Sequence, residues 1–222
     1  MLICALSPLS FAAAQPSTPC PSTTPSGASA LLAAAEACLQ PWGPLLERNA
    51  AQALVYVQNA VSDQLTSADL ARAYDVQGEA HFWLGALGQA IARQTQAIVL
   101  EPTAERYLWR AVTMDRVGDT AGAIADAEQA IAFAPRQLDF YLWLGQYALD
   151  HDANDLALDV MERAATVAPD DADVLRLLGD AHYALSDYAA AKTVYESYLT
   201  FTDNPLPVVI AKLQIIERRL GS

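Results

Sequence analysis

Residues 138–169 read LDFYLWLGQYALDHDANDLALDVMERAATVAP, and this stretch shows the pattern on which most of the chain is built. Small residues stand at Gly145, Ala157 and Ala164, and Pro169 closes the stretch. The same steps of twelve, seven and five residues recur in three other places. An internal repeat of this length predicts a solenoid of stacked units.

The three further copies follow one spacing. In chain order they are Gly78, Ala90, Ala97 and Pro102; Ala111, Ala123, Ala130 and Pro135; and Gly179, Ala191, Tyr198 and Asp203. The first positions of successive copies lie 33, 34 and 34 residues apart. Each copy holds two apolar-periodic segments of helical length. In three of the four copies a proline ends the second segment, because proline has no N–H and clashes with the preceding turn, and in the fourth Asp203 stands in its place. The small residues let the two helices approach closely, and hairpins of this kind must stack to bury their apolar faces.

The pattern resembles the tetratricopeptide repeat, with its framework of an aromatic residue, Leu, Gly, two Ala and Pro. The best match to that framework is Tyr141, Leu144, Gly145, Ala157, Ala164 and Pro169. Gln77 and Arg110 stand where the framework has Leu in the first and second copies. The resemblance covers about 135 of the 222 residues. It implies an all-α fold, a right-handed superhelical solenoid of antiparallel helix hairpins, with the first helix of each hairpin lining a concave wall.

The remaining segments are assigned from composition. Residues 28–66 predict a degenerate N-terminal hairpin, because the seven-residue alanine step persists there while Pro41 occupies a position that no helix interior tolerates. Residues 67–204 hold the four repeats. Residues 205–222 predict a C-terminal capping helix, since apolar residues recur there at helical spacing.

The N-terminus has two parts. Residues 1–14, MLICALSPLSFAAA, resemble the hydrophobic and cleavage regions of a secretory signal peptide, without the basic residues that usually begin one. A start codon assigned too far downstream would account for the missing basic residues, and a disordered apolar tail is the other interpretation. Residues 15–27 are rich in Pro, Ser and Thr and predict a flexible linker. We therefore expect an exported protein, periplasmic or extracellular, with a cytoplasmic location as the alternative.

Two cysteines remain beyond this leader, Cys20 and Cys38. In an oxidising compartment they could form a disulfide that ties the linker to the first helix. Alternatively Cys38 is a small buried side chain and Cys20 is free. The sequence leaves both possibilities open.

The composition limits the classes of partner. The chain has 13 Lys and Arg against 26 Asp and Glu, a formal net charge of −13. Such a surface repels phosphate backbones, so we expect no nucleic-acid binding. Beyond the leader no uncharged apolar stretch reaches about 18 residues, so we expect no membrane span. A net negative charge favours basic or neutral partners, and an equally good explanation is that it keeps the protein soluble.

The family resemblance also implies which side chains line the concave wall. They are Asp75, Glu79, Phe82, Trp83, Leu108, Trp109, Val112, Asp115, Asp139, Leu142, Trp143, Gln146, Leu149, Arg176, Asp180 and Tyr183. Tryptophans on one inner face either anchor a partner or fill seams between hairpins. We expect a groove that binds a protein or peptide segment with apolar anchors and basic side chains. The Lys, Asn and Arg clamp by which one subgroup of the family holds chaperone C-termini is absent here.

The sequence lacks the motifs that are typical of enzymes. The sequence has no Gly-rich phosphate loop, no metal-ligand pair and no nucleophile–base arrangement, so we expect no catalysis, no metal and no cofactor. His81 and His182 share one register of the repeat and are expected to pack. The leading hypothesis is a non-enzymatic protein-interaction scaffold. The alternatives are a structural subunit of an envelope-associated assembly, docking through its ends or convex face, and a cytoplasmic co-chaperone-like adaptor. The oligomeric state stays open.

Overall fold

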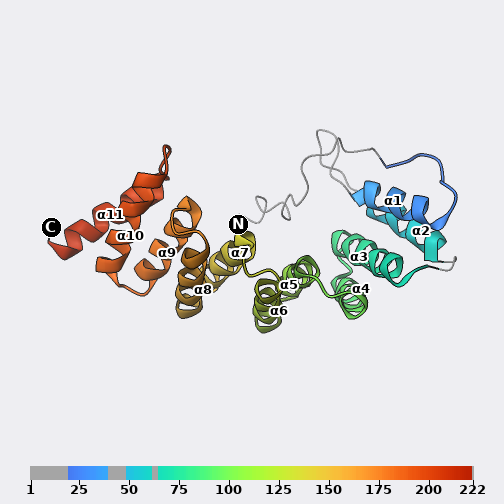
Figure 1. Ribbon diagram of the computed structural model, residues 1–222, viewed down its shortest axis with the longest axis horizontal. Helices are drawn as coiled ribbons and strands as arrows, with labels where there is room; N and C mark the ends of the chain where they lie inside the picture. Colours follow the sequence, from blue (N-terminus) through green and yellow to red (C-terminus); the bar gives the residue numbers. More distant parts are fainter. Residues whose placement is uncertain (1–19, 40–48, 62–64, 222) are drawn as a thin grey trace. The chain divides into compact units, whose positions relative to one another are not determined.

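A computed structural model gives the structure of the chain and describes residues 20–39, 49–61 and 65–221. Within these ranges the regular secondary structure is entirely helical (Figure 1). In chain order the helices are α1 (Ala28–Leu39), α2 (Ala50–Val61), α3 (Ser67–Trp83), α4 (Leu87–Leu100), α5 (Ala104–Val117), α6 (Thr120–Phe133), α7 (Leu138–Asp150), α8 (Asn154–Val167), α9 (Ala172–Ala184), α10 (Tyr188–Phe201) and α11 (Pro207–Leu220). The expected all-α class is confirmed, and the handedness of the solenoid stays a prediction.

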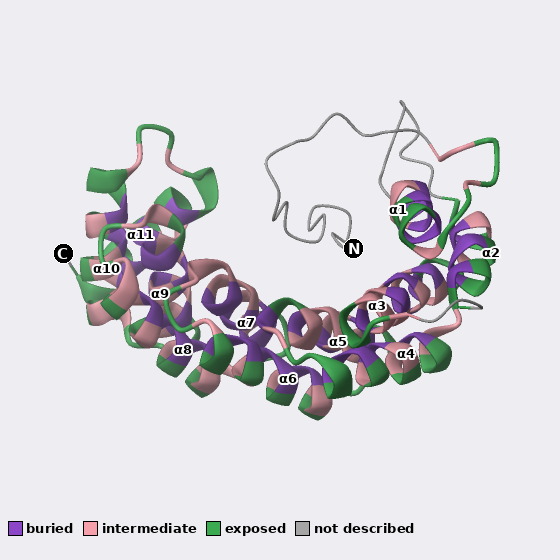
Figure 2. Ribbon diagram, turned by 45° about the vertical axis from the view of Figure 1, so that its right-hand side comes forward, coloured by how far each residue is buried: buried purple, intermediate pink, exposed green. Residues whose placement is uncertain are grey.

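The chain divides into two compact units, Met1–Phe133 and Ala134–Ser222, here called the first and second units. In the first unit the helices pair as α1 with α2, α3 with α4 and α5 with α6, and neighbouring hairpins touch through α2–α3 and α4–α5. In the second unit α7 pairs with α8 and α9 with α10, while α11 packs on α10. Buried residues lie where the paired helices face one another (Figure 2). Each hairpin thus buries its apolar face against its own partner helix and the next hairpin.

Local polar contacts define the helix ends. Thr66 caps α3, where its Oγ1 accepts a hydrogen bond from the backbone N–H of Asp69 at 3.1 Å. Thr103 caps α5 in the same way, accepting from the N–H of Arg106. These side chains satisfy N–H groups that the first turn of a helix leaves without a partner. After α5 the chain turns through Gly118 at φ +81°, a left-handed conformation that glycine adopts without strain.

The repeat glycines lie where a large side chain from the second helix crosses the first. A Cβ atom on Gly145 would lie 2.8 Å from Cε of Met161, and one on Gly179 would lie 2.5 Å from ring carbons of Tyr195. In both cases the crossing residue follows the glycine by sixteen positions. The close approach expected from the spacing is therefore present, and a side chain of the second helix fills it.

In the other two repeats the residue on the first helix is likewise matched in size to the residue that crosses it from the second helix. A Cβ on Gly78 would lie 2.9 Å from Cγ of Gln94, again sixteen residues further on. The second repeat has Ala111 in place of glycine, and the residue at the crossing position there is the small Ala127; both are fully buried. A larger residue on one helix is matched by a smaller one on its partner, as close packing of a protein interior requires.

The N-terminal hairpin is held by a disulfide as well as by its core. Cys20 and Cys38 are joined by an S–S bond of 2.01 Å, closing a sequence separation of 18 residues. Next to it, the hydroxyl of Tyr56 on α2 donates a hydrogen bond to the backbone oxygen of Pro21 at 2.7 Å. Of the two possibilities that the sequence left open for the cysteines, the structure contains the pairing, and the segment before α1 is fixed to both α1 and α2.

No helix within the described residues is long and apolar enough to cross a membrane. The expected leader and Pro41 lie outside the described residues.

Candidate partner-binding site

A hollow of about 260 Å³ opens between α3 and α5 in the first unit. Its lining residues are Asp75, Glu79, Gln94, Thr103, Glu105, Arg106 and Trp109. Three of them, Asp75, Glu79 and Trp109, are wall residues that the family resemblance implied. The structure therefore brings these three together around one concavity.

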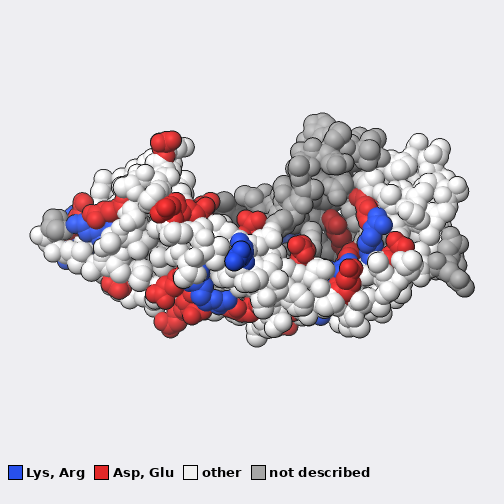
Figure 3. Space-filling model, in the orientation of Figure 1, with Lys and Arg blue, Asp and Glu red and all other residues white. Residues whose placement is uncertain are grey.

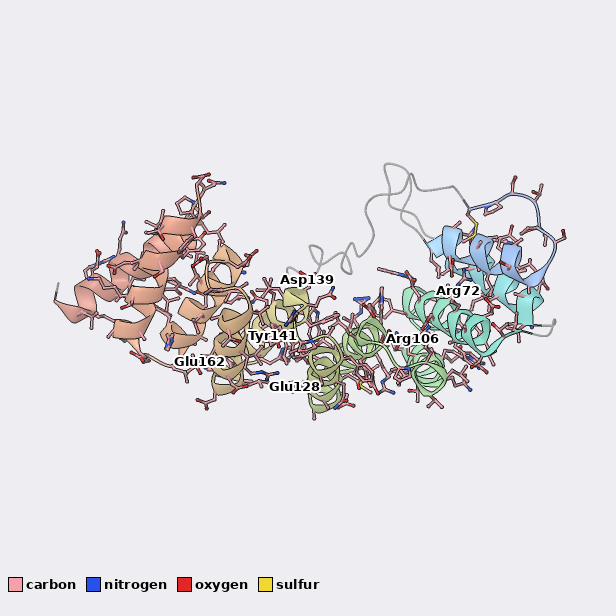
Figure 4. The ribbon with its side chains drawn as sticks, viewed as in Figure 1. Arg72, Arg106, Glu128, Asp139, Tyr141 and Glu162 are labelled. Atoms are coloured by element: carbon pink, nitrogen blue, oxygen red, sulfur yellow. A yellow bond between two sulfur atoms is a disulfide. The ribbon has the colours of Figure 1, made fainter. Side chains whose placement is uncertain are left out.

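Arg106 links the two helices that form the hollow (Figure 4). From α5 its Nε donates hydrogen bonds to both carboxylate oxygens of Asp75 on α3, at 3.1 and 2.9 Å. Its Nη1 donates to the side chain of Glu101 at 3.0 Å and to the backbone oxygen of the same residue. Burial raises the pKa of the Asp75 carboxyl above its ordinary value, and the Arg106 guanidinium offsets part of that rise. This pair fixes the spacing of α3 and α5 at the hollow.

Two more carboxylates lie in the lining, Glu79 and Glu105. Glu79 accepts a hydrogen bond from the indole N–H of Trp83 one turn further along α3, at 3.2 Å. Glu105 lies in the exposed first turn of α5. Among the residues that the structure describes, the lining thus contains three acidic side chains and one basic side chain. Asp and Glu atoms also lie beside Lys and Arg atoms on this part of the surface (Figure 3). A hollow with this balance attracts cations.

An aromatic row runs beside the hollow. Phe82 packs edge to face against Trp83, with ring centroids 5.1 Å apart, and against Trp109 at 6.3 Å. Phe82 itself is only 6% exposed, whereas Trp83 is 36% exposed and Trp109 is half-buried. Phe82 therefore orients the two indoles, and Trp83 and Trp109 present the surface that a partner can reach.

Gln94 of α4 forms the floor, and sequence reasoning missed it. The residue is 5% exposed, and its Nε2 donates hydrogen bonds to Oγ1 of Thr113 at 2.9 Å and to the backbone oxygen of Trp109 at 3.4 Å. The Thr113 hydroxyl donates its own proton to the Trp109 oxygen, so this hydroxyl can only accept from Gln94 and fixes which end of the amide faces it. The amide oxygen Oε1 is then buried, with no hydrogen-bond partner among the residues that the structure describes. The signal in the sequence was a polar residue at the crossing position that other repeats fill with Met161 or Tyr195.

The remaining wall residues of the first unit have other surroundings. Leu108 is 5% exposed, so its side chain, like that of Phe82, belongs to the packed interior and not to the open wall. Little of either side chain is accessible to a partner, and the family-based assignment of the wall stays a prediction. Val112 and Asp115 are partly buried on α5.

In the second unit the wall residues on α7 are partly exposed. Trp143 stacks on Tyr147 with ring centroids 4.9 Å apart and planes 10° from parallel. Gln146 donates a hydrogen bond to Asp150 at 2.9 Å. The positions Asp139 and Leu142 are half-buried, and Leu149 packs against the buried alanines that join α7, α8 and α9.

The wall residues on α9 have partners on α10 and α11. Asp180 accepts hydrogen bonds from the hydroxyl of Tyr195 and from Nζ of Lys212, each at 2.5 Å, and Arg176 lies 3.5 Å from it. Lys212 also lies over the ring of Tyr183, 5.3 Å from its centroid. Asp180 and Tyr183 thus link α9 to the C-terminal helices, whereas Arg176 pairs with Asp180 within α9. Trp83 and Trp109 belong to the first unit and Trp143 to the second, so the expectation that all three share one face stays a prediction.

The described residues contain no group of three or more His, Cys, Asp and Glu side chains placed to hold a metal ion. His81 and His182 are both partly buried, and Nδ1 of His182 lies 3.7 Å from Asp187 at the turn after α9.

Comparison with solved structures decides the fold. The C-terminal part of a tetratricopeptide-repeat (TPR) protein from Cytophaga hutchinsonii matches with a TM-score of 0.66, covering 87% of this chain and 70% of that chain at 16% identity. The chain has the tetratricopeptide-repeat fold. YrrB, described as a TPR protein with an unusual peptide-binding site, matches with a TM-score of 0.58 over 75% of this chain and 84% of its own, at 13% identity. MamA from Desulfovibrio magneticus RS-1, solved from residue 41 to its end, matches with a TM-score of 0.59, covering 70% of this chain and 88% of that chain at 18% identity. No family model and no curated protein matches the chain.

Proposed function

We propose that this TPR chain is a non-enzymatic scaffold that binds a segment of another protein across α3 and α5. The observation that carries the proposal is the hollow between these helices, which gathers Asp75, Glu79 and Trp109 beside the exposed Trp83. The tetratricopeptide-repeat neighbours support an interaction role in general, and one of them, YrrB, is described by its peptide-binding site.

The chemistry of the surface favours a segment with both apolar and basic side chains. Trp83 and Trp109 offer large apolar faces, and aromatic residues of this kind carry much of the affinity in protein interfaces. The carboxylates beside them favour cationic groups, which also interact well with indole rings. A segment with an apolar anchor next to a basic residue meets both requirements.

We also propose that the protein is exported. The disulfide between Cys20 and Cys38 supports this, because such bonds persist in oxidising compartments and are rare in the cytosol. The apolar residues 1–14 favour the same location through their resemblance to a signal peptide.

Affinity capture with matched variants tests the binding proposal. The chain and its Trp83→Ala/Trp109→Ala variant are used as baits, and retained proteins are compared by quantitative mass spectrometry. Val99→Ala is the control, because Val99 lies on α4 and is 77% exposed. The proposal expects partners that the wild type and the Val99 variant retain and the tryptophan variant loses. Equal retention by all three baits would contradict it.

One observation favours a second candidate, a structural subunit that docks through its C-terminal end. Apolar side chains are exposed around α11, with Phe201 at 49%, Leu206 at 44% and Val208 at 55%. Partners lost from a Leu206→Ser/Val208→Ser bait and kept by the tryptophan variant would support this candidate over the first.

A further inference from the structure

We propose that two copies of this chain form a dimer by exchanging α11, so that the α11 of each copy docks on α9 and α10 of the other. The proposal concerns the second unit and is independent of the segment that we expect across α3 and α5. It depends on three features: the contacts that hold α11, the exposed apolar residues beside it, and the turn that joins it to α10.

The apolar contacts that hold α11 do not depend on which copy supplies the helix. Val209, Leu213 and Ile216 of α11 are buried in one cluster with Tyr195 and Tyr198 of α10. The same side chains meet in the same way when α11 belongs to a second copy. An exchanged dimer therefore keeps the buried surface of the single chain, which makes exchange of a terminal element an accessible route to a dimer.

Charged contacts add specificity to this docking. Nζ of Lys212 donates a hydrogen bond to Asp180 on α9 at 2.5 Å and lies over the ring of Tyr183. Arg219 donates a hydrogen bond to the hydroxyl of Tyr188 on α10 at 3.0 Å and lies over its ring. The helix α11 contains three basic residues and one acidic residue, in a chain whose net charge is −13. Its charge therefore complements that of a second copy, whose other residues are acidic overall.

Apolar side chains on both sides of the turn between α10 and α11 are exposed in the single chain. Phe201 ends α10, Leu206 immediately precedes α11 and Val208 lies in its first turn, and each is between 44% and 55% exposed. Figure 2 shows exposed residues at both ends of this turn. In an exchanged dimer the two turns cross near the two-fold axis, so these residues of one copy lie against those of the other and are removed from water. This additional burial favours the dimer over the single chain.

The turn itself favours an extended backbone. Its ends, Thr202 and Leu206, have ψ angles of 131° and 130°, in the extended region. Asn204 precedes Pro205 and Leu206 precedes Pro207, and a residue before proline is disfavoured from the helical region. The prolines thus prevent α10 and α11 from joining into one helix. When extended, the five residues between the helices span up to roughly 17 Å, which lets α11 leave its own chain and dock on a second copy.

Cross-linking of isotopically mixed chains tests the proposal. Unlabelled and heavy-isotope-labelled full chains are mixed in equal amounts, unfolded in urea and refolded together, and monomer and dimer are separated by gel filtration. A carbodiimide then joins the amine of Lys212 to the carboxylate of Asp180, which are in direct contact. We expect a dimer in which about half of these links join a labelled to an unlabelled peptide, because copies pair at random. The links of the monomer should all be unmixed.

Two results would overturn the proposal. One is a chain that stays monomeric at every concentration reached. The other is a dimer whose links between Lys212 and Asp180 are all unmixed, because its copies then associate without exchanging α11.

Variants locate the surface that favours the dimer. Leu206→Ser/Val208→Ser is expected to raise the dissociation constant of the dimer about tenfold, because less apolar surface leaves water on association. Val55→Ser/Val61→Ser is the matched control, because both valines are exposed on α2, and it should leave the dissociation constant unchanged. Urea unfolding of each variant confirms that it is folded. A Leu206→Ser/Val208→Ser dimer as tight as that of the wild type would refute the assignment of the turn to the dimer interface.

Discussion

Arg110 and Asp126 form a two-pronged ion pair between the two helices of the second repeat. Nε of Arg110 donates to one carboxylate oxygen of Asp126 at 2.7 Å, and Nη2 donates to the other at 2.8 Å. The side chains are only 16% and 8% exposed. The hydrogen bond to Asp126 raises the pKa of Arg110 despite its burial. Arg110 stands where the repeat framework has Leu, so a charge on one helix is matched by an opposite charge on the other.

Removing only one charge of this pair should destabilise the first unit more than replacing both residues with apolar ones. Arg110→Leu leaves Asp126 buried without its cation and is expected to lower the free energy of unfolding by about 3–5 kcal/mol. In Arg110→Leu/Asp126→Val both charges are gone and an apolar contact takes their place, so stability should return to near the wild-type value or above it. Val is chosen because Val160 holds the corresponding position in the third repeat. Urea unfolding measures both, and a double variant as unstable as the single would contradict this account.

The repeat glycines should differ in their tolerance of a methyl group. Ala is favoured over Gly in a helix by about 1 kcal/mol, so Gly145→Ala should be nearly neutral if the flexible end of Met161 moves aside. Gly179→Ala should cost about 1–3 kcal/mol, because the ring of Tyr195 is rigid and its hydroxyl is bound to Asp180. Thermal unfolding compares the two. Equal changes in stability for the two variants would show that the side chain crossing from the second helix does not determine whether alanine is tolerated in place of the glycine.

Reduction should destabilise the N-terminal hairpin. The disulfide between Cys20 and Cys38 closes a loop of 18 residues, for which the lost chain entropy corresponds to about 3 kcal/mol. We expect a reducing agent to lower the unfolding midpoint of the wild-type chain and to leave that of Cys20→Ser/Cys38→Ser unchanged. Alkylation of both cysteines before any reduction would show that the bond is not formed.

The stability of the first unit should fall at mildly acidic pH through His81. Burial, aided by the positive charge of Arg93, lowers the pKa of His81 below its ordinary value of 6.5. The unfolded chain therefore takes up a proton more readily than the folded one, so stability declines as pH falls below about 6.5 and levels off once both states are protonated. His81→Gln should make the profile flatter in this window. An unchanged profile would assign the pH dependence to other groups.

Much of the fold follows from the spacing of small residues and prolines. The spacing of small residues and proline locates a helix pair and its end, as in Gly145, Ala157, Ala164 and Pro169. This works because the close approach of two helices and the termination of a helix both depend on local residue type. The disulfide could be named only as a possibility, since the pairing of cysteines depends on where the chain before α1 lies.

The site was predictable only in part. The helix register places Asp75, Glu79 and Trp109 on one side of their helices, and the structure joins them in one hollow. The roles of Asp180 and Gln94 depend on contacts between helices that the register does not specify. Lys212, 32 residues beyond Asp180, neutralises a carboxylate that the wall pattern would leave open.

Hydrogen exchange of the chain with and without its captured partner tests the central claim most directly. If a protein segment binds across α3 and α5, backbone amides of Ser67–Trp83 and Ala104–Val117 should gain protection when the partner is present, and this gain should vanish in Trp83→Ala/Trp109→Ala. Protection that instead falls on α10 and α11, with α3 and α5 unchanged, would contradict the account and favour docking through the C-terminal end.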